Sequence, residues 1–429
     1  MKTTKLIAGL ILCGGIFSAC NNEDGPEPKI ATGEPAALTI SIATPTTYAL
    51  TGAEEAGVGN ENLVTKVELY VFDDAGEPDP KVGGDGYFTA DIATGVTTYK
   101  WTVVVTGGDK KIVAVVNSDL GALPTGDTYD DLIAKLSAAE FKASGADYNS
   151  RTIPATGFEM SGKAESTVVP GVPSSANSVQ IRVSRLVSKI NAPVFTDVAG
   201  VNTAVDLTTE EIEELWGEGT TVTLPDVSFK GLGYALANGI KKSTVIFVGR
   251  ADGDDTTPST RPWTAWTWPV GKEYLNSTFA ADGSYTNNYS GQGSGTDWIL
   301  NGTVDGQKHV YAYENKPKTI TVNGQTGFAP KNVYAFVVKG EFIVDGDEAN
   351  ANGENQIRYW RVDLVRNNNY HILRNNSYHV YLKTITSIGY ATPQEAEETP
   401  DIIPEETDSS AEIQVIVNPW RVNQYEGEV

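Results

Sequence analysis

Short runs in which apolar and polar residues alternate recur along most of this chain. Alternation with a period of two is typical of a strand that buries one face. The first such run, residues 37–43, has an apolar face made of Leu38, Ile40 and Ile42. The last run begins at residue 411, and its apolar face consists of Ile413, Val415 and Val417. Pro419 is expected to end it, because proline has no backbone N–H to donate to a neighbouring strand.

Many more strands are predicted between these two, separated by turn signals rich in Gly, Asn and Asp. They cover residues 63–72, 99–106, 111–117, 178–195, 245–248, 263–270, 309–313, 333–344, 357–365 and 378–388. The run 178–195 is long and places basic residues among aliphatic ones, namely Arg182, Arg185 and Lys189. Two short helices are also expected, one capped by Thr128 and one opened by a capping box of Thr208 and Glu211.

Strands thus dominate, helices are few, and turn signals recur about every ten residues, as in β-sandwiches. A chain of 429 residues is long for one such domain. We predict an all-β protein with two β-sandwich domains and one or two short helices. The N-terminal domain is assigned to residues 36–188 and the C-terminal domain to residues 189–392.

The segment that precedes the last strand, residues 393–410, is acidic, contains prolines and lacks Lys and Arg. This composition favours extended chain, and a segment of this length reaches roughly 60 Å. The C-terminal strand, residues 411–429, is therefore expected to follow a long, acidic, extended linker. It can complete a sheet of its own chain, or it can leave and pair elsewhere.

The N-terminus has the features of an export leader. Basic residues precede an apolar run and then small residues, as in a secretory signal peptide. Residues 1–19 are assigned to this leader, and Phe17-Ser18-Ala19-Cys20 resembles a bacterial lipobox, whose cysteine carries a palmitate-type lipid anchor. We predict a lipoprotein precursor exported to the outer membrane and cell surface, with residues 20–35 as a tether. Cys13 leaves with the leader, so no disulfide or thiolate metal site is expected.

The overall charge narrows the expected partners. A formal charge of −23 at pH 7 repels the phosphate backbone, so nucleic acid is not an expected partner. No apolar run outside the leader is long enough to span a membrane. The membrane is therefore expected as a partner only through the lipid anchor of the precursor.

Candidate chemistry is sparse. The three histidines, His309, His371 and His379, are too scattered to predict a metal site. The acidic stretch 345–354 departs from a calcium loop, because Ala349 stands where a third oxygen ligand is needed. Trp266 and Trp268 share a face of a predicted strand and can stack on a sugar ring, although packing inside a sandwich explains them as well. We predict no enzyme and no cofactor.

Four segments together resemble a known family. They are the lipobox leader; residues 37–52 with 62–76; residues 179–190; and residues 373–389 with the closing run 411–420. The pattern Arg-Asn-x-x-Tyr at Arg374, Asn375 and Tyr378 is a signature within the last of these. In order and spacing, these segments resemble the type V pilins of Bacteroidota, the major fimbrial subunit family.

The resemblance implies two transthyretin-like sandwich domains without catalytic activity. In the family, a trypsin-like protease removes the lipidated N-terminus with the first strand, and the exposed groove accepts the C-terminal strand of another subunit. Leu38, Ile40 and Ile42 would then be the displaced face. Burial of the three aliphatic residues of the donor strand stabilises such a joint by roughly 5–9 kcal/mol. The implied partners are other fimbrial subunits and a maturation protease.

One departure from the family pattern leaves two alternatives open. No Lys or Arg occurs between residues 30 and 65, and Tyr48 stands where relatives have the arginine that is cleaved. Either a protease of different specificity cleaves the linker 44–62, or the subunit keeps its first strand. The first alternative fits a polymerising shaft subunit that supports adhesion, and the second fits a tip or anchor accessory subunit. A glycan-binding surface lipoprotein that does not polymerise is a further alternative.

Overall fold

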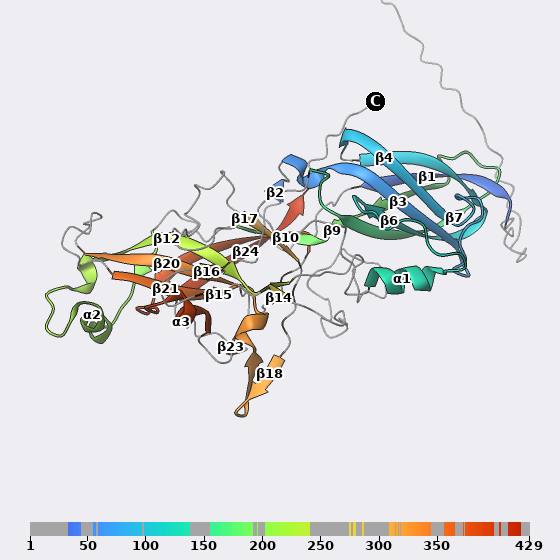
Figure 1. Cartoon of the computed structure of the whole chain (residues 1–429). Coiled ribbons are helices and arrows are strands. Elements are labelled where there is room, and N and C mark those ends of the chain that lie inside the picture. Colours follow the sequence, from blue (N-terminus) through green and yellow to red (C-terminus); the bar gives the residue numbers. More distant parts are fainter. Residues whose placement is uncertain are drawn as a thin grey trace, which may run out of the picture.

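The computed structural model describes most of the predicted strands. The described residues are 33–43, 55–56, 59–96, 98–137, 155–191, 195, 202–240, 274–275, 278–279, 285–286, 309–313, 315, 317, 319–344, 356–364, 372, 374–398, 403–404 and 411–421. They form two groups of sheets, which we call the N-terminal half (residues 33–185) and the C-terminal half (residues 187–421) (Figure 1). The predicted fold class, all-β with sandwich packing and few short helices, is confirmed.

The N-terminal half contains two sheets that pack face to face. One has the strand order β5-β1-β8 and the other the order β4-β3-β6-β7-β9. Their bounds are β1 Pro35–Ala43, β3 Val64–Asp73, β4 Tyr87–Val96, β5 Thr98–Thr106, β6 Gly108–Val116, β7 Met160–Val168, β8 Ser178–Arg182 and β9 Ser184–Arg185. Alternate residues of β3, such as Leu69 and Val71, face β1 in a fully buried core. This is the arrangement that period-two patterning predicts.

The opposite face of the five-stranded sheet is covered by helix α1, Tyr129–Ser137. Thr128 caps this helix, because its Oγ1 accepts from the backbone N of Asp131 at 3.3 Å. Leu132 and Leu136 of the helix are buried in the same cluster as Tyr70 and Phe72 of β3. Both faces of β3 are therefore buried, which explains the apolar residues on both of them.

The basic run that we expected to be one long strand is divided among three sheets. β8 pairs with β1, β9 pairs with β7, and β10, Val187–Asn191, belongs to the C-terminal half. Gly162 of β7 allows the crossing, since a Cβ there would lie 2.1 Å from the carbonyl oxygen of Arg182. One extended segment thus connects the two halves, and the boundary near residue 188 stays a prediction.

The C-terminal half also contains two main sheets. One has the order β17-β10-β22-β24-β2, with β11 beside β22, and the other has the order β12-β20-β21. Their remaining bounds are β2 Glu55–Ala56, β11 Ala204–Val205, β12 Val227–Ala237, β17 His309–Tyr313, β20 Ala335–Val344, β21 Gln356–Asp363, β22 Asn376–Ile385 and β24 Ala411–Arg421. Trp360 is fully buried, and its ring lies 5.2 Å from that of Phe229 and 5.5 Å from that of Phe342. These aromatic residues belong to the main core cluster of the chain.

Smaller elements complete the described part of this half. Helix α2, Thr209–Trp216, opens with the predicted capping box of Thr208 and Glu211. The short strands are β13 Gly239–Ile240, β14 Tyr274–Leu275, β15 Thr278–Phe279, β16 Tyr285–Thr286, β18 Thr319–Val322, β19 Gln325–Phe328 and β23 Ile403–Pro404. The strands expected at 245–248 and 263–270 lie outside the described residues.

The acidic segment 393–410 contains regular structure, which corrects the prediction that this segment is extended. Residues Pro393–Glu398 form helix α3, and β23 pairs with β19. Thr392 and Glu395 cap the helix reciprocally, with the backbone N of Thr392 donating to Oε2 of Glu395 at 3.1 Å and the backbone N of Glu395 donating to Oγ1 of Thr392 at 3.2 Å. Ala396 is buried against β12, β20 and β21. The sequence carried this signal as Thr-Pro-x-Glu, a capping box with proline at the first helical position.

Candidate assembly strands

Strand β1 is central to the N-terminal half. Leu38, Ile40 and Ile42 each have no exposed surface and lie in the core between the two sheets. β1 pairs antiparallel with β5 over Pro35–Ala43 and parallel with β8 over Thr39–Ala43. A strand with partners on both sides contributes its whole backbone ladder and one apolar face to the fold. Its removal would leave a gap lined by β5 and β8.

The start of β1 is also fixed by Asn177, which is buried. The Nδ2 group of Asn177 donates to the carbonyl of Ala37 at 3.2 Å and to that of Val169 at 2.9 Å. Its Oδ1 accepts from the backbone N of Val169 at 3.0 Å, and its carbonyl accepts from the backbone N of Thr39 at 2.8 Å. One side chain therefore ties β1 to the end of β7.

Strand β24 pairs within its own chain. It lies antiparallel to β22, and the register places Ile413, Val415 and Val417 opposite Leu382, Val380 and Tyr378, which are all buried. On its other side, the partner among the described residues is the two-residue strand β2. The side chains of β24 lie outside the described residues. The sequence left open whether this strand completes a sheet of its own chain or pairs elsewhere. In the single chain it completes a sheet of its own chain, an arrangement that we call home-paired.

The prediction that Pro419 ends this strand is wrong, because β24 continues to Arg421. Pro419 is the last residue paired with β22, and from Trp420 onward the partner is β2. Prolines are accommodated near sheet edges, where a ladder hydrogen bond is not required on both sides. The change of partner at Pro419 therefore accounts for the continued strand.

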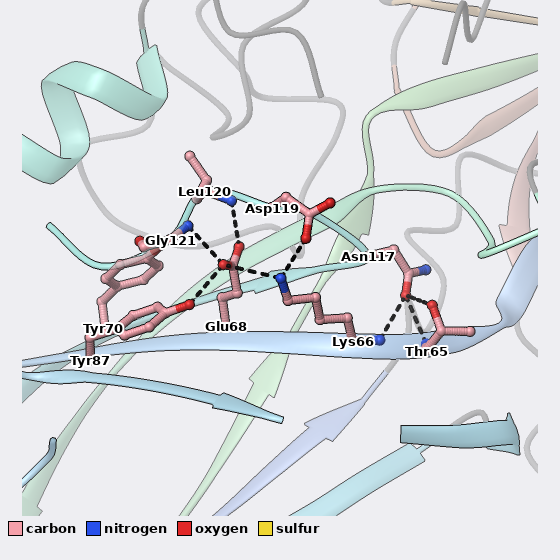
Figure 2. Close-up of polar contacts among 9 residues, drawn as sticks. All are labelled: Thr65, Lys66, Glu68, Tyr70, Tyr87, Asn117, Asp119, Leu120 and Gly121. Atoms are coloured by element: carbon pink, nitrogen blue, oxygen red, sulfur yellow. Dashed lines mark hydrogen bonds and ion pairs between the residues drawn. The ribbon is translucent and has the colours of Figure 1, made fainter. Parts of the chain in front are cut away.

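Polar contacts beside β3 anchor the sheet on which β1 packs (Figure 2). The Glu68 side chain is fully buried, and its carboxylate accepts from Tyr87 OH at 2.9 Å and from the backbone N of Leu120 and Gly121 at 2.9 and 2.8 Å. Lys66 lies 3.7 Å from Glu68 and 2.5 Å from Asp119. These donors compensate the buried charge of Glu68, and they hold the loop after β6 against β3.

Asn117 ends β6 in a left-handed conformation, with φ 56°, which asparagine adopts more readily than most residues. Its Oδ1 accepts from the backbone N of Thr65 at 2.8 Å (Figure 2), and its Nδ2 donates to the carbonyls of Leu63 and Phe158 at 2.7 and 2.8 Å. Asn117 therefore links the start of β3 to the segment before β7.

A second buried polar group lies where the two halves meet. We call it the junction cluster, and it consists of Glu61, Asn62, Arg185, Lys189, Tyr311 and Asn375. Glu61 and Asn62 belong to a 3₁₀ turn, η1 Gly59–Asn62, which lies between β1 and β3 in sequence. Lys189 Nζ lies 3.2 Å from Oε1 of Glu61, and Tyr311 OH donates to the same oxygen at 2.5 Å. Burial lowers the pKa of Arg185 to about 10, so its guanidinium stays charged at neutral pH.

The structure places only some of the residues predicted from the sequence. Leu38, Ile40 and Ile42 share a buried face as expected, whereas Cys20, Trp266 and Trp268 lie outside the described residues. Arg185 and Lys189, noted only as basic residues in an apolar run, come together at the junction cluster. Glu61 was not singled out, because no local pattern distinguishes one acidic residue of a linker from another.

Within the described residues, no group of three or more His, Cys, Asp or Glu side chains is placed to hold a metal ion. His309 lies on β17, where its Nε2 is 2.8 Å from Tyr311 OH, and His379 lies on β22. No helix of the described part of the chain is long and apolar enough to cross a membrane.

Residues 341–426 match the family model described as major fimbrial subunit protein type IV, fimbrillin, C-terminal. The matched region runs from β20 to beyond β24 and contains the Arg374-Asn375-x-x-Tyr378 pattern. The resemblance to the fimbrial subunit family is confirmed for this region. The fimbrillin match thus includes the home-paired β22 and β24. No curated protein matches the chain.

Solved structures of fimbrial proteins are similar to this chain at low sequence identity. A fimbrilin, FimA, from Porphyromonas gingivalis is 17% identical, with 91% of this chain and 99% of that chain covered and a TM-score of 0.48. The tip fimbrial protein Mfa3 from Porphyromonas gingivalis, solved with a C-terminal truncation, is 13% identical, with 90% and 100% covered and a TM-score of 0.42.

Proposed function

We propose that this protein is a structural subunit of a cell-surface fimbria, and that it polymerises by inserting its C-terminal strand into a neighbouring subunit. The observation that carries the proposal is the match of residues 341–426, including β24, to the fimbrillin C-terminal family. The subunit supports adhesion mechanically, and no catalytic step is part of the proposal. Its partners are further copies of the chain and accessory fimbrial subunits.

The proposed acceptor site is the place now occupied by β1. Because β1 lies between β5 and β8, its loss exposes the edges of two strands and the apolar core that Leu38, Ile40 and Ile42 cover. Exposed strand edges of this kind pair readily with an added strand. A donor with alternating aliphatic residues meets the chemical demands of such a gap.

The proposed donor is β24, released from β22. Among the described residues, its outer side pairs with the two-residue strand β2, so release of β24 breaks one long ladder. The exchange replaces pairing with β22 in the same chain by pairing with β5 and β8 of the next subunit. A joint with two strand partners is expected to be more stable than the home position, which has one long partner.

Maturation in this proposal includes lipidation at Cys20 and loss of β1 by cleavage in the linker that follows it. The buried Glu61 and Asn62 restrict cleavage to positions before η1. If Cys20 carries the lipid, Cys20→Ser blocks incorporation of labelled palmitate and leaves the precursor unanchored. Continued labelling of the Cys20→Ser chain would refute this part of the proposal.

Strand exchange is tested directly with a chain that carries Tyr48→Arg and is cleaved after the new arginine. A synthetic peptide of residues 411–421 is expected to displace the β1 fragment, as measured by intact mass of the folded protein. The same peptide with Val415 and Val417 replaced by Asp serves as the control and is expected to leave β1 in place. Retention of β1 with both peptides would refute the exchange mechanism.

The absence of Lys and Arg between residues 30 and 65 favours one second candidate role. A subunit that keeps β1 cannot accept a donor and would end a fimbria as an accessory anchor or tip. N-terminal sequencing of the protein isolated from fimbriae distinguishes the two roles. A terminus between residues 44 and 58 supports the shaft role, and a terminus at Cys20 supports the accessory role.

A further inference from the structure

The segment between β1 and β3 belongs to the N-terminal half by sequence but also contacts the C-terminal half. β2 pairs in parallel with β24, and Figure 1 shows β2 between the two groups of sheets. Farther along the segment, Glu61 is fully buried and contacts Lys189 of β10 and Tyr311 of β17. The connection between the first two long strands of one half is therefore docked on the other half.

The contacts of the Glu61 carboxylate are set by the sheet register. Lys189 and Tyr311 are direct cross-strand partners on β10 and β17, so their side chains share one face. Both reach Oε1 of Glu61, at 3.2 Å from Nζ and 2.5 Å from the hydroxyl. Tyr311 also packs against Phe158 of the N-terminal half, with ring centroids 4.6 Å apart. The same tyrosine thus contacts that half through both its ring and its hydroxyl.

The guanidinium of Arg185 connects three segments that are distant in sequence. Its Nε donates to the carbonyl of Glu61 at 2.9 Å, and its two terminal nitrogens donate to the side-chain oxygens of Asn375, at 2.8 Å, and Asn62. Asn375 has φ 57° and donates its backbone N to the carbonyl of Val187 at 2.8 Å. This geometry gives a physical role to the asparagine of the Arg-Asn-x-x-Tyr pattern, because asparagine tolerates the left-handed conformation.

The junction cluster contains a buried ion pair between Glu61 and Lys189. Lys189 is buried beside the carboxylate of Glu61, and the buried Arg185 donates to the backbone carbonyl of the same residue. Removal of one partner from a buried ion pair is strongly destabilising, because an uncompensated charge stays in the interior. The relevant cations lie on consecutive strands, β9 and β10, that belong to different halves. A loss at Glu61 therefore acts on the connection between the halves and not on one sandwich alone.

We propose that Glu61 joins the two halves into one mechanical unit, and that Arg185, Lys189, Tyr311 and Asn375 are its positioning partners. Glu61 lies after β1, at the end of the linker 44–62, so the joint stays in the chain when cleavage before η1 removes the first strand. A subunit in which one half accepts a strand and the other donates one needs such a joint to transmit force between them. This last consequence rests on the proposed function, whereas the joint itself does not.

The experiment uses the full-length chain as a monomer, so its result is independent of polymerisation. The variants are Glu61→Ala and the milder Tyr311→Phe, which keeps the ring on Phe158 but removes the hydroxyl. The matched control is Asp79→Asn. The Asp79–Lys110 pair is also buried and also 3.2 Å long, but it lies wholly within the N-terminal half. Calorimetry measures whether the chain unfolds in one transition or in two.

The wild-type chain and Asp79→Asn are expected to unfold in a single transition, with a lower midpoint for the control. Glu61→Ala is expected to lose this coupling and to unfold in two transitions, one for each half. Tyr311→Phe is expected to lower the ratio of van't Hoff to calorimetric enthalpy. A single transition in all variants would overturn the proposal and would assign the coupling to apolar contacts such as that of Phe158.

A distance measurement gives a second readout for variants that stay folded. Lys100 and Glu214 are exposed, one in each half, and Lys100→Cys with Glu214→Cys provides spin-label sites once Cys13 and Cys20 are replaced by Ser. The distance distribution is expected to broaden in Glu61→Ala and in Tyr311→Phe, but not in Asp79→Asn. Equal distributions in all chains would refute the proposal, as would equal broadening in the control.

Discussion

The strands at the two ends of the described chain, β1 and β24, have similar sequences but different positions. Each presents alternating aliphatic residues over a run of comparable length. β1 pairs with the nine-residue β5 on one side and the five-residue β8 on the other, whereas β24 has β22 on one side and the two-residue β2 on the other. Amphipathic pattern therefore indicates a strand but not whether it lies in the centre of a sheet or near its edge.

The difference also separates the two roles that strand exchange requires. A central strand leaves a gap with two edges when it is removed, which is the property of an acceptor. A strand with one long partner can leave its sheet with the loss of one ladder, which is the property of a donor. Four changes test this comparison, in order of decreasing expected effect.

The largest effect is expected for Ile40→Asp in the centre of β1. Ile40 has no exposed surface, so the change buries a carboxylate without a partner and destabilises the fold by on the order of 4 kcal/mol or more. Thermal denaturation followed by circular dichroism measures the loss. Ser41→Asp, on the half-buried opposite face of the same strand, is the control and should change the midpoint far less. Equal effects would show that β1 is not part of the core.

A smaller loss is expected when residues 411–429 are deleted. β22 loses its long partner, but its buried residues Tyr378, Val380 and Leu382 remain packed in the core. The shortened chain should therefore fold with a lower midpoint in urea, and a peptide of residues 411–421 added in trans should restore part of it. Complete unfolding of the shortened chain would show that β24 is as necessary for the fold as β1, and it would contradict the comparison.

Asn177→Ala tests how firmly β1 is held. The change removes the side-chain hydrogen bonds to Ala37 and Val169, with an expected cost of about 1–3 kcal/mol. Hydrogen exchange of the amides in β1 should become faster, while that of β24 should not change. Gln180→Ala, at an exposed position of β8, is the control. Unchanged exchange in β1 would show that its two strand partners hold it without Asn177.

The smallest effect is expected for Glu159→Gln near pH 5, and the effect of this change on the half that holds β1 grows with pH. Burial raises the pKa of Glu159 to about 8 from its ordinary value of 4.5. The folded chain thus holds this proton more tightly than the unfolded chain does. Its stability falls as pH rises between these two values, by at most about 1.4 kcal/mol per pH unit.

Urea midpoints of the wild type and Glu159→Gln at pH 5, 6.5 and 8 measure this contribution. The difference between the two chains should grow with pH in favour of the glutamine variant. A constant difference would mean that Glu159 titrates normally and that its carboxylate reaches solvent. Glu159→Ala is not a suitable substitute, because it would also change the packing of a buried side chain.

Local signals in the sequence were sufficient for the all-β class, many strands and the first two helices, but the predicted strands do not include β4, β7 and β12. Period-two runs predicted β1, β3, β17, β20, β21 and β22, and the caps at Thr128 and Thr208 predicted α1 and α2. These features depend on residues that are close in the chain, so they can be read without knowledge of the fold. Helix α3 was predictable in the same way from Thr392 and Glu395, although its acidic composition was interpreted as extended chain.

Tertiary structure alone decided how the extended segment 178–191 is divided among three sheets, and that β24 pairs at home in the single chain. It also decided that Glu61 meets Arg185 and Lys189 across more than a hundred residues of sequence. Strand register and the crossing at Gly162 bring these charges together, and both depend on packing between distant segments. The sequence by itself indicated the all-β class and many of the segments that form strands. Only the folded chain shows which strands are neighbours and which buried charges compensate one another. Those contacts connect residues that are far apart in sequence, so no local pattern predicts them.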